Sequence, residues 1–154
     1  MQDLREIEAI KQLKYKYLRC VDLKRWDELR ECFAEDATSA YGDGQYSFRG
    51  REQIMEFLIA RMDRPTFITF HHCHHPEIQL TSSTTAVGIW AMEGMGIDLQ
   101  AGTINHCAAY YHDEYVQRNG QWQIALTGYD YLYDAVQSLA DTPSLRLTQN
   151  RFAK

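Results

Sequence analysis

The sequence predicts an α+β fold in which a curled antiparallel sheet wraps around N-terminal helices. Three observations predict it. Near the N-terminus, apolar residues recur at spacings of three and four, which is the helical period. After Pro65, long stretches are rich in β-branched and aromatic residues and are separated by turn residues, a pattern typical of strands. The 154 residues contain no linker and no internal repeat, and this length suits one domain with one core.

Two helices are expected first. Residues 2–21 carry a single apolar stripe, made of Leu4, Ile7, Ile10, Leu13, Tyr17 and Val21. A bend near Asp22 leads to a short second helix in "RWDELRECF", where Trp26, Leu29 and Phe33 keep the same period. Next, "ATSAYGDGQYSFRG" predicts two short strands around the Gly42-Asp43-Gly44 turn. "GREQIMEFLIARM" predicts a third helix that ends before Pro65, because the residue before a proline disfavours helix.

Four long strands are expected after Pro65. Their sequences are "TFITFHHCHHPEIQL", "TTAVGIWAMEGMGID", "TINHCAAYYHDEYVQR" and "QWQIALTGYDYLYD", and the turn signals "TSS", "QAG" and "RNG" separate them. We expect one domain over residues 1–133. Residues 134–154 are less periodic and predict a C-terminal tail that packs on the domain or on a neighbouring subunit.

Composition excludes several classes of partner. The net charge is −5, with acidic and basic residues mixed, which argues against nucleic-acid and anionic-membrane partners. No apolar run approaches the roughly 18 residues of a membrane span. The charged opening "MQDLREIEAI" is not a secretory signal. The four cysteines form no CxxC pair and suggest reduced thiols in a cytoplasmic protein.

The histidine cluster is the most unusual local feature, with four of six histidines in residues 71–75. On a strand, His71, Cys73 and His75 point to one face, and His72 and His74 point to the other. All four therefore cannot converge on one ion. A His-x-His zinc pair needs a third ligand, such as His106, and the sequence does not demand one. We expect no metal, with one imidazole pointing into a cavity.

Asp22 ends the apolar stripe of the first helix, where a carboxylate is poorly placed for simple solvation. One interpretation is an N-cap for the second helix. The alternative is a buried carboxylate held against an imidazole, a pair that fixes the histidine tautomer and favours general-base catalysis. The ten tyrosines need partners for buried hydroxyls, so we expect some of them to line a wet cavity.

The order of these motifs resembles a known superfamily. The layout is similar to the nuclear-transport-factor-2-like (cystatin-like) cone fold, and "DLREIEAIKQLKYKYLRCVDLKRWDELRECFAEDATSAY" resembles the opening of SnoaL-like dehydratases. Within that group, bile-acid 7α-dehydratases and scytalone dehydratase are the most similar. The resemblance spans nearly all of residues 3–133, including "HPEI" and "NGQWQIALTGY".

The resemblance implies a cofactor-independent dehydratase. It places His71 at the position of the catalytic histidine, Asp22 beside it, and Tyr41 and Tyr17 toward the substrate. The related dehydrochlorinase has a less clear register, in which His74 is the alternative base. The expected substrate-binding residues are Trp90, His106, Tyr111, Tyr129 and Tyr131, and Tyr133 shares the strand face of the last two.

The chain also departs from the bile-acid enzymes. Gly94 stands where they carry an aspartate, with Glu93 one position away on the opposite face, and Tyr131 replaces a functional arginine. A bile-acid substrate is therefore not expected. His106 and Tyr111, on the next strand, are the candidates for the missing donor, and a strand-lining role in the core is the alternative for them.

We accordingly expect loss of water from a hydrophobic hydroxy-carbonyl substrate, which is alicyclic, polyketide-like or steroid-like. An isomerase or polyketide cyclase and a non-catalytic ligand-binding module are the alternatives, because one fold hosts many functions. Without a GxGxxG or P-loop motif, no nucleotide cofactor is expected. The resemblance also implies a homo-oligomer, either a trimer or a dimer.

Overall fold

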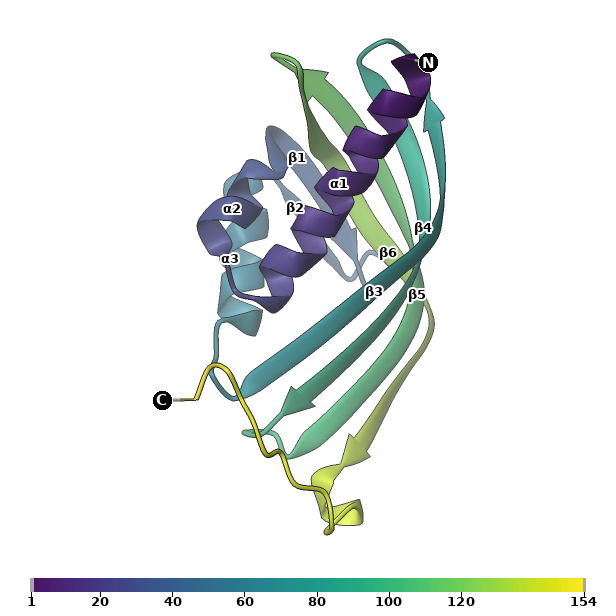
Figure 1. Cartoon of the computed structure of the whole chain (residues 1–154). Helices are drawn as coiled ribbons and strands as arrows, with labels where there is room; N and C mark the ends of the chain where they lie inside the picture. The colour runs from purple at the N-terminus through teal and green to yellow at the C-terminus, as the bar shows by residue number, and fades with distance from the viewer. Residues whose placement is uncertain (1, 154) are drawn as a thin grey trace.

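Helices cover one side of a single curled sheet (Figure 1). The computed structural model describes residues 2–153, except for the side chain of Gln2. The helix α1 lies across the concave side of the sheet, and α2 and α3 lie beside it (Figure 1). The helices span Gln2–Asp22 (α1), Trp26–Glu31 (α2) and Arg51–Met62 (α3), and a 3₁₀ turn spans Leu139–Asp141. No described helix is both long and apolar enough to cross a bilayer.

The sheet contains six strands in the order β2-β1-β6-β5-β4-β3. All neighbouring pairs are antiparallel except β1 and β6, which run parallel. The predicted α+β fold with a curled sheet around N-terminal helices is confirmed. The strands span Phe33–Tyr41 (β1), Tyr46–Arg49 (β2), Phe67–Leu80 (β3), Thr85–Asp98 (β4), Thr103–Arg118 (β5) and Gln121–Ser138 (β6).

The turns follow the local chemistry of the sequence. Asn119 and Gly120 connect β5 to β6 with φ values of 52° and 76°. Two successive left-handed residues match the right-handed twist of the flanking strands, and Asn-Gly adopts this conformation readily. The hairpin between β1 and β2 uses three left-handed residues, Gly42, Asp43 and Gly44. The turn signals therefore correctly predict where the strands next to these turns end and begin. Two other boundaries differ from the prediction: β1 already begins at Phe33, which was expected in the second helix, and β6 continues to Ser138, into the segment expected as a tail.

Gly128 permits the parallel pairing of β1 and β6. A Cβ atom at this position would lie 2.4 Å from the backbone oxygen of Ala40. Real Cβ atoms do not approach backbone oxygens so closely, so another residue would push the two strands apart. This pairing positions Tyr41 at the end of β1, with its ring against Tyr129 of β6.

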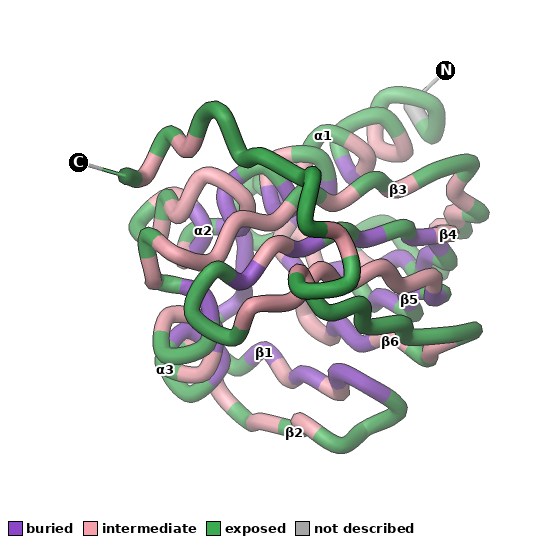
Figure 2. Tube along the Cα trace, turned by 90° about the horizontal axis from the view of Figure 1, so that it is seen from below, coloured by how far each residue is buried: buried purple, intermediate pink, exposed green. Residues whose placement is uncertain are grey.

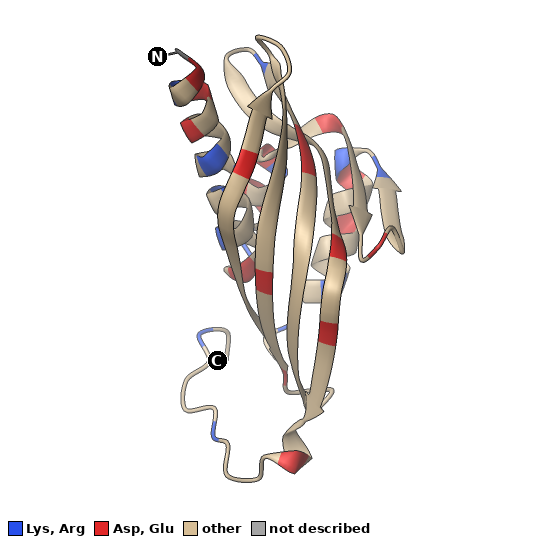
Figure 3. Ribbon diagram, turned by 90° about the vertical axis from the view of Figure 1, so that its right-hand side faces the viewer, with Lys and Arg blue, Asp and Glu red and all other residues tan. Residues whose placement is uncertain are grey.

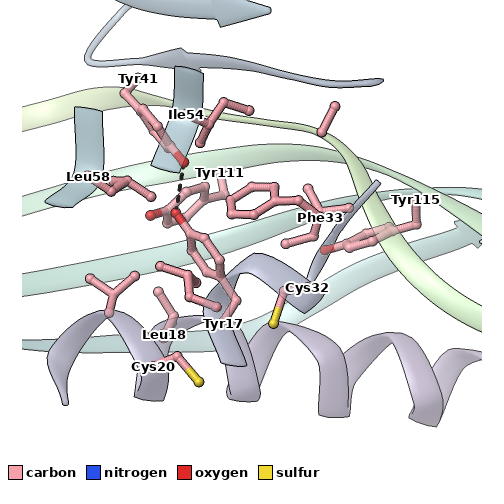
Figure 4. Close-up of a cluster of buried hydrophobic side chains, with 14 of the residues drawn as sticks. Tyr17, Leu18, Cys20, Cys32, Phe33, Tyr41, Ile54, Leu58, Tyr111 and Tyr115 are labelled. Atoms are coloured by element: carbon pink, nitrogen blue, oxygen red, sulfur yellow. Dashed lines mark hydrogen bonds between the residues drawn. The ribbon is translucent and has the colours of Figure 1, made fainter. Parts of the chain in front are cut away.

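The core lies between the helices and the concave face of the sheet, where the buried segments in Figure 2 face one another. Burial alternates along β4 with a period of two, as expected for a strand with one covered face. Figure 4 shows the aromatic part of this core, in which Tyr17 of α1 lies beside Phe33 and Tyr111.

The segment that follows β6 runs back toward the loop before β3 and the loop after α1. The last strand continues to Ser138, and the segment after it is largely exposed (Figure 2). Asn150 donates a hydrogen bond from Nδ2 to the backbone oxygen of Pro65 at 2.8 Å. The Phe152 ring lies 4.8 Å from the Lys24 ammonium. The tail thus contacts the loop between α3 and β3 and the loop that follows α1.

Candidate active site

A cavity of about 390 Å³ lies between α1, α3 and the concave face of the sheet. Its volume is in the range of small-molecule sites. His71 and Gly94 form part of its wall. The wall is rich in phenols, which come from α1 and from four strands: Tyr17, Tyr41, Tyr46, Tyr111, Tyr129 and Tyr131.

The end of α1 and the middle of β3 bring Asp22 and His71 together. Nδ1 of His71 lies 2.6 Å from Oδ1 of Asp22, and Asp22 Oδ2 accepts the backbone N–H of His71 at 2.9 Å. Asp22 also accepts the hydroxyl of Thr69 at 2.9 Å. An ionised carboxylate only accepts, so Nδ1 donates and Nε2 carries the lone pair. The predicted pairing of these two side chains is confirmed.

The alternative interpretation of Asp22 as the N-cap of the second helix is wrong. Asp22 is the last residue of α1, and the residue before α2 is Arg25, which makes no side-chain capping bond. The three hydrogen bonds that Asp22 accepts all come from β3. Its side chain is 10% exposed and that of His71 is 19% exposed, so the pair is largely shielded from water but still accessible from the cavity.

From His71 to His74, the histidines alternate between the two faces of the sheet, as expected for a strand. His71 faces the cavity, whereas His72 and His74 are exposed on the convex face. A β-bulge between His74 and Glu77 changes the alternation, and His75 takes a left-handed φ of 27° and is exposed. The expectation that His75 shares the face of His71 is therefore wrong. Among the described residues of the cluster, His71 alone lines this cavity.

Tyr17 and Tyr41 meet at their hydroxyls, 3.1 Å apart (Figure 4). Both residues are almost fully buried. Burial raises the pKa of each phenol well above its usual value, and the neighbouring phenol adds to this effect at Tyr41. Both phenols therefore stay protonated near neutral pH and can donate hydrogen bonds. Tyr129 and Tyr131 form a second pair on β6, with their hydroxyls 3.4 Å apart.

Gly94 leaves space beside the imidazole. It lies directly opposite His71 in the β3–β4 register. A Cβ at Gly94 would lie 3.3 Å from Cδ2 of His71 and 3.0 Å from Sγ of Cys107. The neighbouring Glu93 is exposed on the opposite face, as predicted. The carboxylate that the bile-acid enzymes carry here therefore has no substitute at this point of the cavity wall.

Two predicted substrate-binding residues lie elsewhere. Trp90 is fully buried in the core, and its indole donates to the Tyr115 hydroxyl at 2.9 Å. His106 lies on the convex face, where it contacts Glu93 and Tyr133, because Asn105 and Cys107 on either side of it face the cavity. Both assignments are wrong. Trp90 faces inward but packs against Tyr15 and Tyr115 in the core, and the sequence does not reveal which parity of β5 faces inward, which misplaced His106.

Tyr133 is also on the other side of the sheet from Tyr129 and Tyr131. The register changes between Ala108 and Ala109, which pair with Tyr133 and Tyr131. The extra residue on β6 is Leu132, which is 67% exposed. This bulge reverses the alternation after Tyr131. Tyr129 and Tyr131 thus line the cavity, and Tyr133 lies outside it.

Residues 2–127 match the family described as the SnoaL-like domain. The chain belongs to this family.

Solved structures show the same fold. A hexachlorocyclohexane dehydrochlorinase of type 2 is similar with a TM-score of 0.80 and 21% identity, over 88% of this chain and 91% of the other. A proposed scytalone dehydratase from Novosphingobium aromaticivorans gives a TM-score of 0.79 and 23% identity over the same shares. A protein of unknown function from Mycobacterium tuberculosis gives 0.72 and 22%, over 95% of this chain and 80% of the other. Lyase-type enzymes and proteins without an assigned function thus share this architecture.

This SnoaL-like chain also contains a buried ion pair that the sequence analysis missed. Lys14 of α1 and Asp113 of β5 lie 2.7 Å apart, and neither side chain is exposed. Asp113 also accepts the hydroxyls of Tyr115 and Thr127, each at 2.7 Å. Burial lowers the pKa of Lys14, and the carboxylate of Asp113 opposes that shift.

The Lys14–Asp113 pair lies behind the part of the cavity wall that Tyr111 forms. The Lys14 ammonium lies 3.4 Å from the ring centroid of Tyr111, whose other side contacts the cavity. A signal for Lys14 was present in the sequence, because it falls between Ile10 and Tyr17 on the apolar stripe of α1. A lysine in that stripe requires a buried acceptor.

The cavity has a charged rim that the sequence analysis also missed. Arg64 donates to Asp98 at 2.8 Å, and the backbone amides of Gln100 and Ala101 donate to the same carboxylate. Burial acts to raise the pKa of Asp98, but these donors outweigh it and hold the pKa below its usual value. The rim therefore stays charged at neutral pH.

Proposed function

We propose that the protein is a cofactor-independent dehydratase that removes water from a hydrophobic β-hydroxy-carbonyl compound. The substrate class is alicyclic, polyketide-like or steroid-like. The observation that carries the proposal is His71 in the wall of a cavity lined by tyrosines, with Asp22 bonded to its Nδ1. Removing a proton next to a carbonyl group requires an oriented base and, near it, hydrogen-bond donors that stabilise the enolate.

The proposed reaction begins at Nε2 of His71. This atom takes the proton from the carbon next to the carbonyl, and the electrons of the broken C–H bond form an enolate. The negative carboxylate of Asp22 stabilises the imidazolium that results and keeps the ring in place. General acid–base catalysis of this kind contributes about 10²–10⁴-fold to the rate.

The phenols stabilise the negative charge that develops on the enolate oxygen. Tyr17 and Tyr41 come from separate elements and hold their hydroxyls together, so one of them can turn its proton to the substrate. Preorganised donors of this type act most strongly where water is excluded. Both residues are nearly fully buried, which meets that condition.

The second half of the reaction expels the hydroxyl group. The enolate electrons re-form the carbonyl and create the C=C bond as the C–O bond at the β-carbon breaks. The His71 imidazolium returns its proton to the departing oxygen, so water leaves and the enzyme is restored. One histidine thus serves as both base and acid. This suits a site that has Gly94 at the position where the bile-acid enzymes carry a further carboxylate. The name of the similar dehydrochlorinase describes another elimination, that of HCl.

The test uses a panel of cyclic β-hydroxy ketones, with enone absorbance as the readout. The native protein is expected to form an enone from at least one of them. His71→Gln is expected to lose about 10²–10⁴-fold of that rate. His112→Gln is the matched control, because His112 is an exposed histidine on the convex face, paired with Asp130.

The same panel in D₂O separates the alternatives. Exchange of the α-proton without enone would indicate an isomerase or cyclase that uses the same base. Ligand binding with neither exchange nor enone would indicate a binding module. Either outcome, or full activity in His71→Gln, contradicts the dehydratase proposal.

We also propose that copies of the chain associate as a trimer or dimer through the convex face of the sheet. Large apolar side chains are exposed there, among them Phe70, Met95 and Leu132. Exposed apolar patches of this kind mark interaction sites. Light scattering after size exclusion should give a mass of two or three chains, and Leu132→Lys should lower it. A monomeric native protein contradicts this part of the proposal.

A further inference from the structure

Two histidines and one glutamate meet on the convex face of the sheet, on the side opposite the cavity. Their potential ligand atoms all lie within 4.8 Å of one another, and the three residues, His72, His74 and Glu93, are exposed. Neither the proposed dehydration nor the core uses these side chains. Polar side chains that are solvated separately do not need to lie this close together.

Strand geometry places these residues together. His72 and His74 are two positions apart on β3, so they point to the same face. Glu93 of β4 lies directly opposite His72 in the antiparallel register. The imidazole rings of His72 and His74 are 5.8 Å apart and inclined by 33°. The backbone thus presents the three side chains side by side without any rearrangement of the sheet.

The set of donors is one that divalent transition metals prefer. Two imidazole nitrogens and one carboxylate oxygen form a known zinc ligand set, with bonds of about 2.0–2.2 Å and an open fourth position. Bonds of that length require the donors to come closer than they lie here. Rotation about the χ angles of these exposed side chains can close the difference. For His72 this means turning from its edge-on contact with the Phe70 ring, whose centroid lies 4.5 Å away.

Glu93 has a supporting partner. Nε2 of His106 lies 2.8 Å from Oε1 of Glu93, and the Tyr133 hydroxyl lies 3.0 Å from Nδ1 of the same histidine. Residues that hold a ligand in this way are a regular feature of metal sites, since they orient the ligand before the metal binds. The surrounding strands carry mainly uncharged positions with scattered acidic ones (Figure 3), which favours a cation.

We propose that His72, His74 and Glu93 bind a divalent transition-metal ion of the zinc type on the convex face of the sheet. The sequence analysis expected no metal and considered His106 as a third ligand. In the structure the third ligand comes from the neighbouring strand as Glu93, and His106 orients it. His71 points to the other face of β3, into the tyrosine-lined cavity. At the edge of β3, Asp22 and His71 also border a second hollow together with His72 and His74.

The test titrates metal-free protein with ZnCl₂ in an isothermal calorimeter, with concentrations expressed per chain. The native protein should bind one ion per chain in a saturable manner. Glu93→Gln and the double variant His72→Gln/His74→Gln should lose this binding. His106→Gln should weaken it by about tenfold, the size expected for a residue that orients a ligand. His112→Gln, an exposed histidine outside the cluster, should bind like the native protein.

Circular dichroism confirms that each variant is folded before its titration is interpreted. A native protein without saturable zinc binding overturns the proposal. Binding that survives in Glu93→Gln, or that is weakened equally in His112→Gln, also overturns it, because general attraction of zinc by surface histidines then explains the signal. Enone formation by the metal-free protein is measured separately, so failure of the zinc site and failure of the proposed dehydratase are distinguishable.

Discussion

Two acid–base pairs connect α1 to the sheet, and they differ in access rather than in kind. Asp22 and His71 lie 2.6 Å apart, and Lys14 and Asp113 lie 2.7 Å apart. The first pair is partly exposed, at 10% and 19%, and borders the cavity. The second pair is fully buried.

The contrast shows why similar pairs have different roles. Donors from Lys14, Tyr115 and Thr127 occupy both oxygens of Asp113, so this carboxylate has no route to a substrate. His71 keeps one ring nitrogen free toward the cavity. We therefore assign stability to the buried pair and proton transfer to the partly exposed one. Substitutions of the same type in the two regions test this assignment.

Loss of the buried charge should have the largest effect. Asp113→Asn leaves the Lys14 ammonium without its counter-ion, and breaking a buried pair costs about 3–5 kcal/mol of folding free energy. Urea denaturation measures the change. The control is Asp36→Asn, which removes an exposed pair with Arg118 and should leave the stability almost unchanged. Equal stability of the two variants would remove the distinction between the regions.

The same substitution in the cavity should affect rate more than stability. Asp22→Asn takes away the charge that stabilises the His71 imidazolium, so enone formation should fall by about 10²-fold, equivalent to about 2.7 kcal/mol in the barrier. The denaturation midpoint should change less than in Asp113→Asn. If Asp22→Asn is as active as the native protein, the assigned role of the pair is wrong.

Two glycines of β4 allow a matched comparison of packing. A Cβ at Gly88 would lie 3.1 Å from Tyr115 and 3.2 Å from Trp90, beside the buried pair, whereas one at Gly94 would approach His71. Gly88→Ala should destabilise the fold by about 1–3 kcal/mol through overpacking. Gly94→Ala should instead raise KM, because its methyl group occupies space beside the imidazole. If Gly88→Ala raises KM and Gly94→Ala leaves KM unchanged, the assignment of Gly88 to packing and Gly94 to the cavity is reversed.

The tyrosines predict a gradual loss of stability in alkali. Burial raises the pKa of Tyr17, Tyr41, Tyr111 and Tyr115 well above the ordinary value of 10.0. Below pH 10 both states keep these protons. Above it the unfolded chain loses them first, so stability falls by about 1.4 kcal/mol per pH unit for each such phenol.

Phenolate absorbance and circular dichroism, followed together, measure this effect. The half-buried Tyr131 should contribute to the part of the titration that precedes unfolding, and Tyr115 to the part that coincides with it. Tyr131→Phe and Tyr115→Phe should each remove the corresponding part. Ionisation of all ten tyrosines before the loss of secondary structure would contradict the burial argument.

Local sequence was sufficient for the elements and their order. The apolar stripe of α1, the Asn119-Gly120 turn and the long strands after Pro65 all agree with the structure. Alternation alone also separates His71 from His72 and His74. These features depend on interactions between near neighbours, which the sequence displays directly.

Contacts between distant residues required the folded chain. Asp22 and His71 are 49 positions apart and Lys14 and Asp113 are 99 apart. The family resemblance, not a local pattern, predicted the first pair, and the sequence analysis missed the second. The bulges after His74 and at Leu132 reverse which face a residue occupies, and they arise from pairing with the adjacent strand. For this reason His106 and Tyr133 could be placed on the convex face only from the tertiary structure, because register and sidedness depend on the partner strand and on which face the helices cover.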